Sequence, residues 1–323
     1  MANAISTQSR TAAQSNGGAI AQLNRMIVPS EKNELRKRFD DLLGVRAERF
    51  LRQVVSNVGR NSYLQNASPM SILGAAMMAA TLNLDLSPSL GMAAIVPYGN
   101  GKTGKVDATF QVMVNGWVQL ALRSGEYAGI NTGFVYQDEL ANVNLLTGGL
   151  TLKDAPSDGG LRAKAKGGLT YREMKAEGVA GAFCWFRLIN GFEKTVYWSL
   201  EDIDRHGRMY SKSYKQDLEF NKSASLWTTN FRAMAAKTVV KNAIVKWGPK
   251  SVDMYQAEWN EGHAVDEDGD TFELPNEFIK GADAEMVDVR MQDAPEDAEP
   301  SQPYDGQPGP ESFEDSGDLL EGL

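Results

Sequence analysis

Cysteine and histidine are scarce in this sequence, which contains only Cys184, His206 and His263. A single cysteine excludes an internal disulfide, and three such residues are too few for an ordinary Cys/His structural zinc site with four ligands. The chain also lacks a run of about 18 apolar residues, the length that a membrane-spanning helix needs. Its N-terminus lacks the basic and apolar regions of a secretion signal, so we expect a cytoplasmic protein.

Positive charge is in deficit overall, because 33 Lys and Arg face 42 Asp and Glu, for a net charge of -9. At face value this balance disfavours a nucleic-acid-binding protein. The charge is segregated, however. Residues 1–250 hold 31 basic and 20 acidic side chains (+11), and residues 251–323 hold 2 basic and 22 acidic ones (-20). Such asymmetry indicates a basic, nucleic-acid-binding region with an acidic tail.

The composition predicts three parts. Residues 1–30 are rich in Ala, Ser, Gln, Asn and Gly, so we expect a disordered N-terminal arm. Residues 31–250 form the expected core domain. Residues 251–323 are expected to be an acidic, mostly disordered tail that competes with DNA, recruits a partner or only adds solubility.

Local signals within the core predict both helices and hairpins, and therefore an α+β fold. Ser68 followed by Pro69 is typical of a helix start. One long helix is predicted over 226–246, with Trp227 on its buried apolar stripe. Two β-rich runs around a Gly/Asn/Lys turn near residue 102 predict one hairpin, and Asn190-Gly191 predicts another. The strand before this second turn is apolar on both faces, so we expect it to be central and covered.

Three patterns imitate catalytic or metal sites. Gly101-Lys102-Thr103 resembles part of a phosphate-binding loop, but the glycine needed five positions earlier is Val96. The acidic run from Asp266 resembles an EF-hand loop, but it has Thr271 where that loop needs glycine. Cys184 and His206 are formally a nucleophile and a base, but Cys184 lies in an apolar run. A carboxylate metal site of a DNA nuclease stays open as an alternative.

The stretch from Arg205 to Lys215 interleaves cations with tyrosines, and its Gly and Ser suggest an adaptable loop. Cations release counterions from phosphates, and tyrosine rings stack on bases, so this stretch is typical of a single-strand binding surface; a solvated loop is the alternative. Arg162, Lys164 and Lys166 have the spacing of one face of an extended segment, either along a phosphate backbone or on an edge strand.

Two further lysines, Lys237 and Lys241, lie one turn apart on the predicted long helix. Like charges at this spacing repel in an isolated helix. The pair is therefore either solvated or faces an anion.

Three stretches, SPMSILGAAMMAATLNLDLSPSLGMAAIVPYG, FQVMVNGWVQLALRSGEY and WTTNFRAMAAKTVVKNAIVKWGP, resemble the characteristic blocks of the RecT/Redβ family of phage and prophage single-strand annealing proteins. They occur in family order and bracket roughly residues 60–250. The central block has Asn115-Gly116-Trp117 where many members carry a basic residue, and Trp117 is a core or groove residue on this reading.

The resemblance implies a compact core of a bent antiparallel sheet packed by helices, and an ATP-independent protein without catalytic residues. It would bind single-stranded DNA through the backbone, pair it with a complementary strand and hold the duplex in a ring or helical homo-oligomer. Implied partners are a phage 5′-to-3′ exonuclease and host single-strand binding protein in the bacterial cytoplasm. No cofactor or metal is expected to be required, although Mg²⁺ is expected to modulate DNA binding. A metal-dependent DNA nuclease and a phage structural or scaffolding protein are the alternatives.

Combining the residue patterns with the resemblance gives one set of candidate DNA-binding residues. They are Lys102, Lys105, Arg162, Lys164, Lys166, Arg205, Arg208, Tyr210, Lys212, Tyr214, Lys215, Lys237 and Lys241.

Overall fold

The computed structural model describes residues 9–30, 32–99, 104–144, 148–154, 156–223, 225–266 and 268–274. Its helices are α1 Ser9–Met26, α2 Glu34–Leu43, α3 Ala47–Arg60, α4 Pro69–Thr81, α5 Val114–Arg123, α6 Gly160–Lys164, α7 Tyr171–Ala176, α8 Leu200–Tyr210, α9 Lys212–Phe220, α10 Leu226–Thr229, α11 Phe231–Trp247 and α12 Val252–Glu261. Its strands are β1 Ala93–Gly99, β2 Val106–Val112, β3 Tyr127–Tyr136, β4 Leu140–Val143, β5 Leu150–Leu152, β6 Val179–Leu188, β7 Glu193–Ser199, β8 His263–Val265 and β9 Thr271–Glu273.

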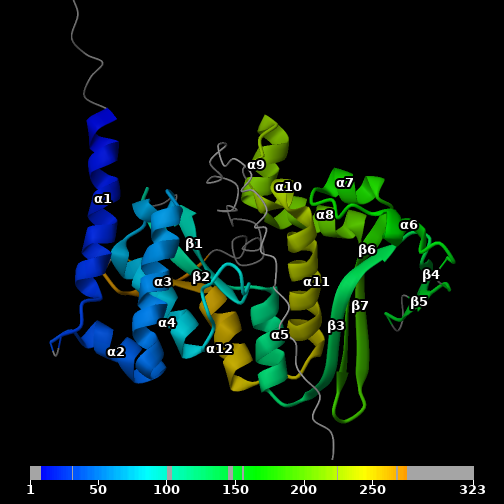
Figure 1. Cartoon of the computed structure of the whole chain (residues 1–323), viewed down its shortest axis with the longest axis horizontal. Coiled ribbons are helices and arrows are strands. Elements are labelled where there is room, and N and C mark those ends of the chain that lie inside the picture. Colours follow the sequence, from blue (N-terminus) through cyan, green and yellow to red (C-terminus); the bar gives the residue numbers. More distant parts are fainter. Residues whose placement is uncertain are drawn as a thin grey trace, which may run out of the picture. The chain divides into compact units, whose positions relative to one another are not determined.

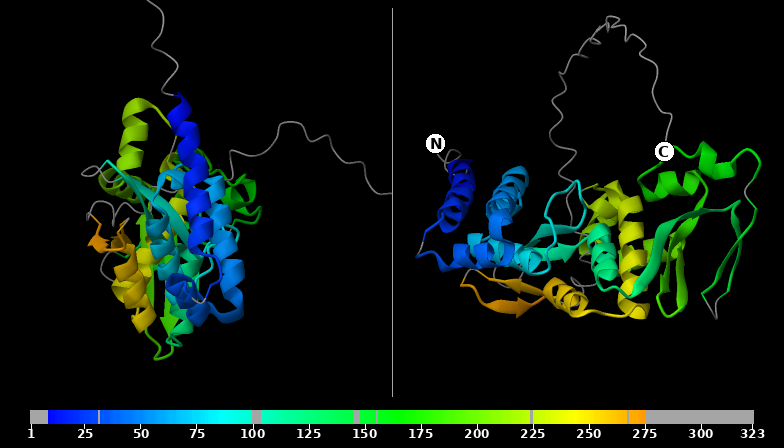
Figure 2. Two further views of the ribbon diagram at one scale, coloured as in Figure 1. Left: turned by 90° about the vertical axis from the view of Figure 1, so that its left-hand side faces the viewer. Right: turned by 60° about the horizontal axis from the view of Figure 1, so that its bottom comes forward.

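The strands form antiparallel sheets packed by helices, which confirms the predicted α+β class (Figure 1). In place of one bent sheet, the described strands form sheets with the orders β1-β2-β8-β9 and β3-β6-β7 and a β4-β5 hairpin. Helix α4 packs on β2 and β8, while α11 packs on β6 and β7. Helices α5 and α11 contact each other and lie between the two larger sheets (Figure 2).

Local sequence signals account for several of these elements. Ser68 caps α4 by accepting a hydrogen bond from the Ser71 backbone N–H, and Pro69 opens the helix as predicted. The Asn190-Gly191 hairpin is confirmed, with Gly191 at φ 87°, where glycine is favoured. The predicted long helix is instead interrupted at Asn230, whose side chain accepts from the Ala233 backbone N–H and so begins α11 after the short α10. No described helix is long and apolar enough to cross a membrane.

The described elements extend past both of the core boundaries that the composition suggested. Helix α1 lies in the expected disordered arm, and its Leu23 is fully buried against the core because the helix packs on α3 and α4. At the other end, α12 packs on β2 and α5, and β8 pairs with β2 at Ala264 opposite Thr109. Residues 252–274 therefore add a helix and two strands where an acidic tail was expected.

Strand β6 is the central strand of its sheet, as predicted, but its two faces differ. Ala182, Cys184 and Phe186 are buried on the face that α11 covers. Phe183 and Trp185, on the opposite face, are only half-buried. The expectation that both apolar faces are covered is therefore correct for one face only.

Candidate nucleic-acid interface

The stretch from Arg205 to Lys215 is helical and not an adaptable loop. Ser199 caps α8 by accepting from the Asp202 backbone N–H, and Ser211 ends α8 and caps α9 by accepting from the Tyr214 backbone N–H. These serines satisfy backbone groups that would otherwise lack partners at the helix ends. The cations of this stretch are therefore held on two contacting helices.

Tyr214 is a core residue in this structure. It is 3% exposed, its ring stacks on Trp227 at 5.6 Å, and its hydroxyl donates a 2.6 Å hydrogen bond to Asp204. Burial and the Asp204 carboxylate raise the pKa of Tyr214. The predicted base-stacking role does not fit this position. Tyr210 is half-buried beside His206, with 4.7 Å between ring centroids, and Trp227 is buried as predicted.

Arg205 and Arg208 are exposed on α8 but each pairs with a carboxylate of its own helix. Arg205 lies 3.0 Å from Asp202 and Arg208 lies 2.6 Å from Asp204. The hydrogen bond that Arg208 donates to the Asp204 carboxylate raises the pKa of Arg208. The Arg205–Asp202 pair is exposed on both sides, and such pairs contribute only about 0–1 kcal/mol to stability, so a phosphate can compete for Arg205 at small cost. Asp204 is buried, so Arg208 is held more firmly by its partner.

Lys215 is exposed on α9 and makes no ion pair with another described residue. Lys212 begins α9, but its side chain lies outside the described part. Lys175 of α7 approaches Glu201 of α8 at 3.4 Å and joins these helices at the surface. We use the name α7–α9 surface for Lys175, Arg205, Arg208 and Lys215 of these helices, together with Lys166 of the segment that precedes α7.

Arg162, Lys164 and Lys166 do not lie on one extended strand. Arg162 and Lys164 belong to the short helix α6, where residues two apart point in different directions. Arg162 donates to Glu139 at 2.7 Å and to the Phe134 carbonyl, and this guanidinium lowers the pKa of Glu139. Lys164 pairs with Asp158 at 2.8 Å. The Lys166 side chain is exposed and has no ion pair to a described residue.

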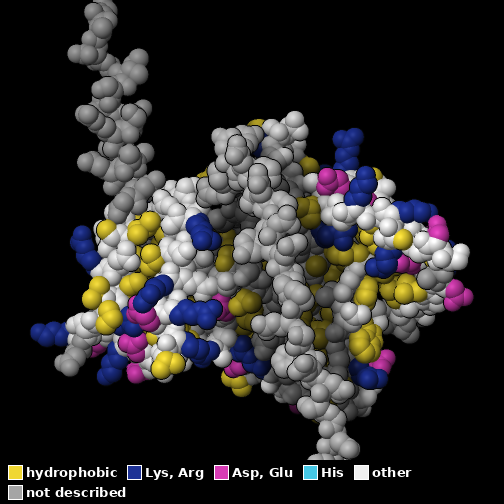
Figure 3. Space-filling view, in the orientation of Figure 1, with side chains coloured by type: hydrophobic (Ala, Val, Ile, Leu, Met, Phe, Trp, Pro, Cys, Tyr) yellow, Lys and Arg dark blue, Asp and Glu magenta, His cyan; other side chains and the backbone are white. Residues whose placement is uncertain are grey.

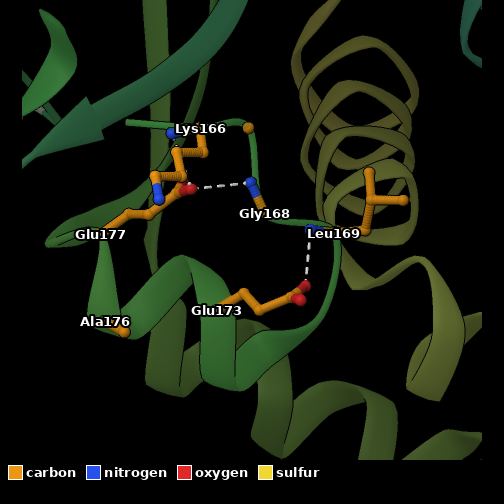
Figure 4. Close-up of a pocket in the computed structure, with 7 residues that line it drawn as sticks. Lys166, Gly168, Leu169, Glu173, Ala176 and Glu177 are labelled. Atoms are coloured by element: carbon orange, nitrogen blue, oxygen red, sulfur yellow. Dashed lines mark hydrogen bonds between the residues drawn. The ribbon is translucent and has the colours of Figure 1, made fainter. Parts of the chain in front are cut away.

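A pocket beside Lys166 is lined by two carboxylates (Figure 4). Glu177 accepts 2.9 Å hydrogen bonds from the backbone N–H groups of Lys166 and Gly168, and Glu173 accepts from Leu169. The backbone hydrogen bond from Thr170 lowers the pKa of Glu173. The N–H groups of Lys166, Gly168 and Leu169 already donate to carboxylates, so this pocket is poorly suited to a phosphate.

Lys237 and Lys241 point into the protein and face internal partners. Lys237 is 2% exposed and donates to the Gln111 side chain at 3.2 Å. Lys241 lies 2.9 Å from the Glu261 carboxylate, which also accepts from the Val112 backbone N–H at 2.8 Å. The pair was expected either to be solvated or to face an anion. Lys241 faces such an anion, Glu261 of α12, whereas Lys237 faces the neutral side chain of Gln111.

The β1–β2 hairpin contributes one described cation. Lys105 is exposed beside the start of β2, whereas Lys102 lies outside the described residues. The hairpin itself is confirmed, with Ala93 opposite Val112.

A second basic surface lies on α2 and α3. Figure 3 shows Lys and Arg side chains gathered over these helices and, separately, over α6 and α7. Lys37, Arg38, Arg49 and Arg60 are exposed without an ion pair to a described residue. We call these four the α2–α3 surface. The helical spacing of its cations was the available signal, but a solvated helix face has the same spacing.

The candidate nucleophile Cys184 is fully buried on β6. Burial raises its pKa to about 12, so the thiolate that reacts is scarce at neutral pH. No group of three or more His, Cys, Asp or Glu that could hold a metal ion occurs within the described residues.

We expect Cys184 of the native protein to react with a maleimide or disulfide reagent only after unfolding, because reagent access and thiolate formation are both blocked. Mass spectrometry with and without denaturant measures this. Prompt labelling of the native protein, at the rate of a free thiol, would contradict the buried position.

Comparisons with known proteins converge on one family. The RecT family matches residues 48–274, which span most of the described elements. An uncharacterized protein, YqaK of Bacillus subtilis (strain 168), is 35% identical over 276 residues, covering 84% of this chain and 83% of YqaK. Protein RecT of Escherichia coli (strain K12) is 30% identical over 95 residues, covering 29% of this chain and 35% of that protein. The matched region ends at Leu274, directly after β9, which is the edge strand of the β1-β2-β8-β9 sheet. The chain therefore belongs to the RecT family.

Proposed function

We propose that this protein is an ATP-independent single-stranded DNA annealing protein of phage recombination. The observation that carries the proposal is the family match over residues 48–274, because RecT family membership implies a single-strand annealing recombination protein. In this proposal the chain binds the DNA backbone, pairs complementary strands and holds the duplex in a homo-oligomer.

The exposed cations support a backbone-binding mechanism. Annealing requires two polyanions to approach while their base-pairing edges stay accessible, so the protein has to neutralise phosphates without covering those edges. Stacking in the new duplex supplies on the order of 1.4 kcal/mol per base-pair step, which makes nucleotide hydrolysis unnecessary. Cations in weak exposed pairs, such as Arg205 with Asp202, can exchange a carboxylate for a phosphate.

The proposal extends to partners and location. A phage 5′-to-3′ exonuclease would expose the strand, host single-strand binding protein would be a second partner, and the work would take place in the bacterial cytoplasm. Mg²⁺ would modulate binding by screening phosphates, with no cofactor required.

The direct test is the pairing of two complementary oligonucleotides carrying a fluorescence donor and acceptor, without ATP at low salt. We expect the protein to accelerate pairing well beyond the spontaneous rate, with an acceleration that falls as salt rises. Pairing at the spontaneous rate would overturn the proposal. Degradation of the labelled strands with Mg²⁺ or Mn²⁺ would point to a nuclease instead.

The two basic surfaces give different expected effects on DNA binding. The double variant Lys166→Gln/Lys215→Gln removes two cations of the α7–α9 surface that have no described ion pair. We expect the slope of log affinity against log salt to fall by about 0.7 for each lost phosphate contact on a single strand. Titration of labelled single strands at several salt concentrations measures the slope.

The matched control is Lys37→Gln/Arg49→Gln, which removes two cations from the α2–α3 surface. We expect this control to keep the wild-type slope. If only the control variant loses slope, DNA lies on α2 and α3 and the assignment to the α7–α9 surface is wrong.

A further inference from the structure

One face of the β3-β6-β7 sheet is covered by no helix of the described part of the chain, and this face carries aromatic rings. Phe183 and Trp185 of β6 and Tyr197 of β7 alternate with the buried residues that face α11. Phe183 pairs directly with Tyr197 in the strand register, so the two rings share a face with Trp185. All three side chains are half-buried. Figure 3 shows hydrophobic side chains over these strands.

Glycines lie close to each of the three rings. A Cβ added to Gly133 would lie 3.2 Å from the Phe183 ring, and one added to Gly129 would lie 3.4 Å from the Trp185 ring. At Gly181 a Cβ would lie 2.7 Å from the Tyr197 hydroxyl. The missing Cβ atoms leave room for the rings to approach the backbone closely at these positions.

Charged groups flank the rings at both ends of the face. The Arg187 guanidinium lies 6.0 Å from the Trp185 ring centroid, within reach of a cation–π contact. At the other end, burial raises the pKa of Tyr197, and Glu201 and Asp202 of α8 add to this shift. Asp202 is the ion-pair partner of Arg205.

We propose that Phe183, Trp185 and Tyr197 form a base-stacking platform for single-stranded DNA, an inference that rests on the proposed function. An unpaired base can place its flat face on a ring while its base-pairing edge stays free. Bases in a duplex are already stacked on both sides and cannot reach the platform. The platform thus holds the strand before pairing and releases it afterwards, while the α7–α9 cations keep contact with phosphates.

The test compares two probes with equal phosphate spacing, an oligothymidylate and a strand of the same length made of abasic sites. We expect the wild-type protein to bind the oligothymidylate more tightly. Trp185→Leu, which keeps apolar bulk and removes the flat ring, is expected to weaken oligothymidylate binding about tenfold and to leave abasic binding unchanged. Trp185→Phe is expected to retain most of the preference because it restores an aromatic face.

Trp247→Leu is the matched control, because Trp247 is 44% exposed and lies at the end of α11, outside this face. We expect it to keep the wild-type ratio of the two affinities. Equal losses for both probes in Trp185→Leu would overturn the platform, as would an unchanged ratio. Dissociation of an assembly by Trp185→Leu without a change in this ratio would indicate that a second copy covers the face.

The outcome is separable from that of the annealing assay. If the wild-type protein prefers oligothymidylate through Trp185 but does not accelerate pairing, the inferred platform is supported and the proposed annealing function is wrong. If pairing is rapid but the protein shows no preference between the two probes, the annealing function is supported and the inferred platform is wrong.

Discussion

Replacing Gly116 by alanine is expected to destabilise the protein by about 3 kcal/mol or more, beyond the ordinary cost of overpacking a core. Gly116 lies in the first turn of α5, against the chain that leads into β1. An added Cβ would lie 2.0 Å from the Met92 carbonyl oxygen and 2.7 Å from a Val112 methyl carbon. The carbonyl belongs to the backbone and accepts a 2.8 Å hydrogen bond from Met113, so it cannot turn away without breaking that bond.

Denaturant unfolding, followed by circular dichroism, measures this loss, and Gly59→Ala is its matched control. Gly59 is also helical, but no atom lies within 4 Å of its added Cβ. Alanine at this position is expected to raise the free energy of unfolding by about 0.5–1 kcal/mol, because glycine loses more backbone entropy in a helix. A loss below about 1 kcal/mol for Gly116→Ala would show that α5 can move away from Met92.

Replacing Glu261 by glutamine is expected to lower the free energy of unfolding by about 3 kcal/mol, as for other buried pairs that lose one partner. Glu261 is 1% exposed, and its carboxylate faces Lys241 while also binding the Val112 N–H. The neutral amide would leave Lys241, whose side chain is 18% exposed, with little water to replace the lost charge. Lys237 lies one helical turn away and adds a second positive charge.

Glu258→Gln is the control for this prediction, because Glu258 lies on the same helix and pairs with Lys250 nearer the surface, with 43% of its side chain exposed. We expect this control to cost at most about 1 kcal/mol. Denaturant unfolding of both variants and of Glu261→Gln/Lys241→Met gives the comparison. The double variant is expected to recover part of the loss, since it removes the stranded cation. Equal small losses in both single variants would show that water reaches the Glu261 site.

The extent of the folded region changes the charge argument. Residues 1–250 carry a net charge of +11, but β8 and β9 extend the described elements to Leu274. Residues 1–274 hold 31 basic and 28 acidic side chains, a net charge of +3, and residues 275–323 hold 2 basic and 14 acidic ones. DNA affinity therefore has to come from the placement of cations, and total charge contributes little.

Several features of the fold could be predicted because their causes are local. The Ser68-Pro69 helix start depends on hydrogen bonds between residues three apart, and the Asn190-Gly191 turn depends on the backbone freedom of two residues. The position of Trp227 in the core followed from helical periodicity. The three family blocks likewise lie in sequence, and the family match confirms them.

The candidate site was less predictable because its character depends on distant partners. Lys237 and Lys241 showed a repulsive spacing, but their partners Gln111 and Glu261 are far away in the sequence. In the sequence Tyr214 is an aromatic residue between basic residues, but in the structure its ring packs on Trp227 and its hydroxyl donates to Asp204. Composition and periodicity carry no information about such pairings.

By itself, the sequence determined the family, the α+β class, the caps and turns, and the absence of disulfide chemistry within the chain. Only the tertiary structure decided which cations face water, which carboxylates neutralise them, and which face of β6 the described helices cover. The physical reason is range. Backbone propensities act over a few residues, whereas burial and ion pairing depend on segments that meet only after the chain has folded.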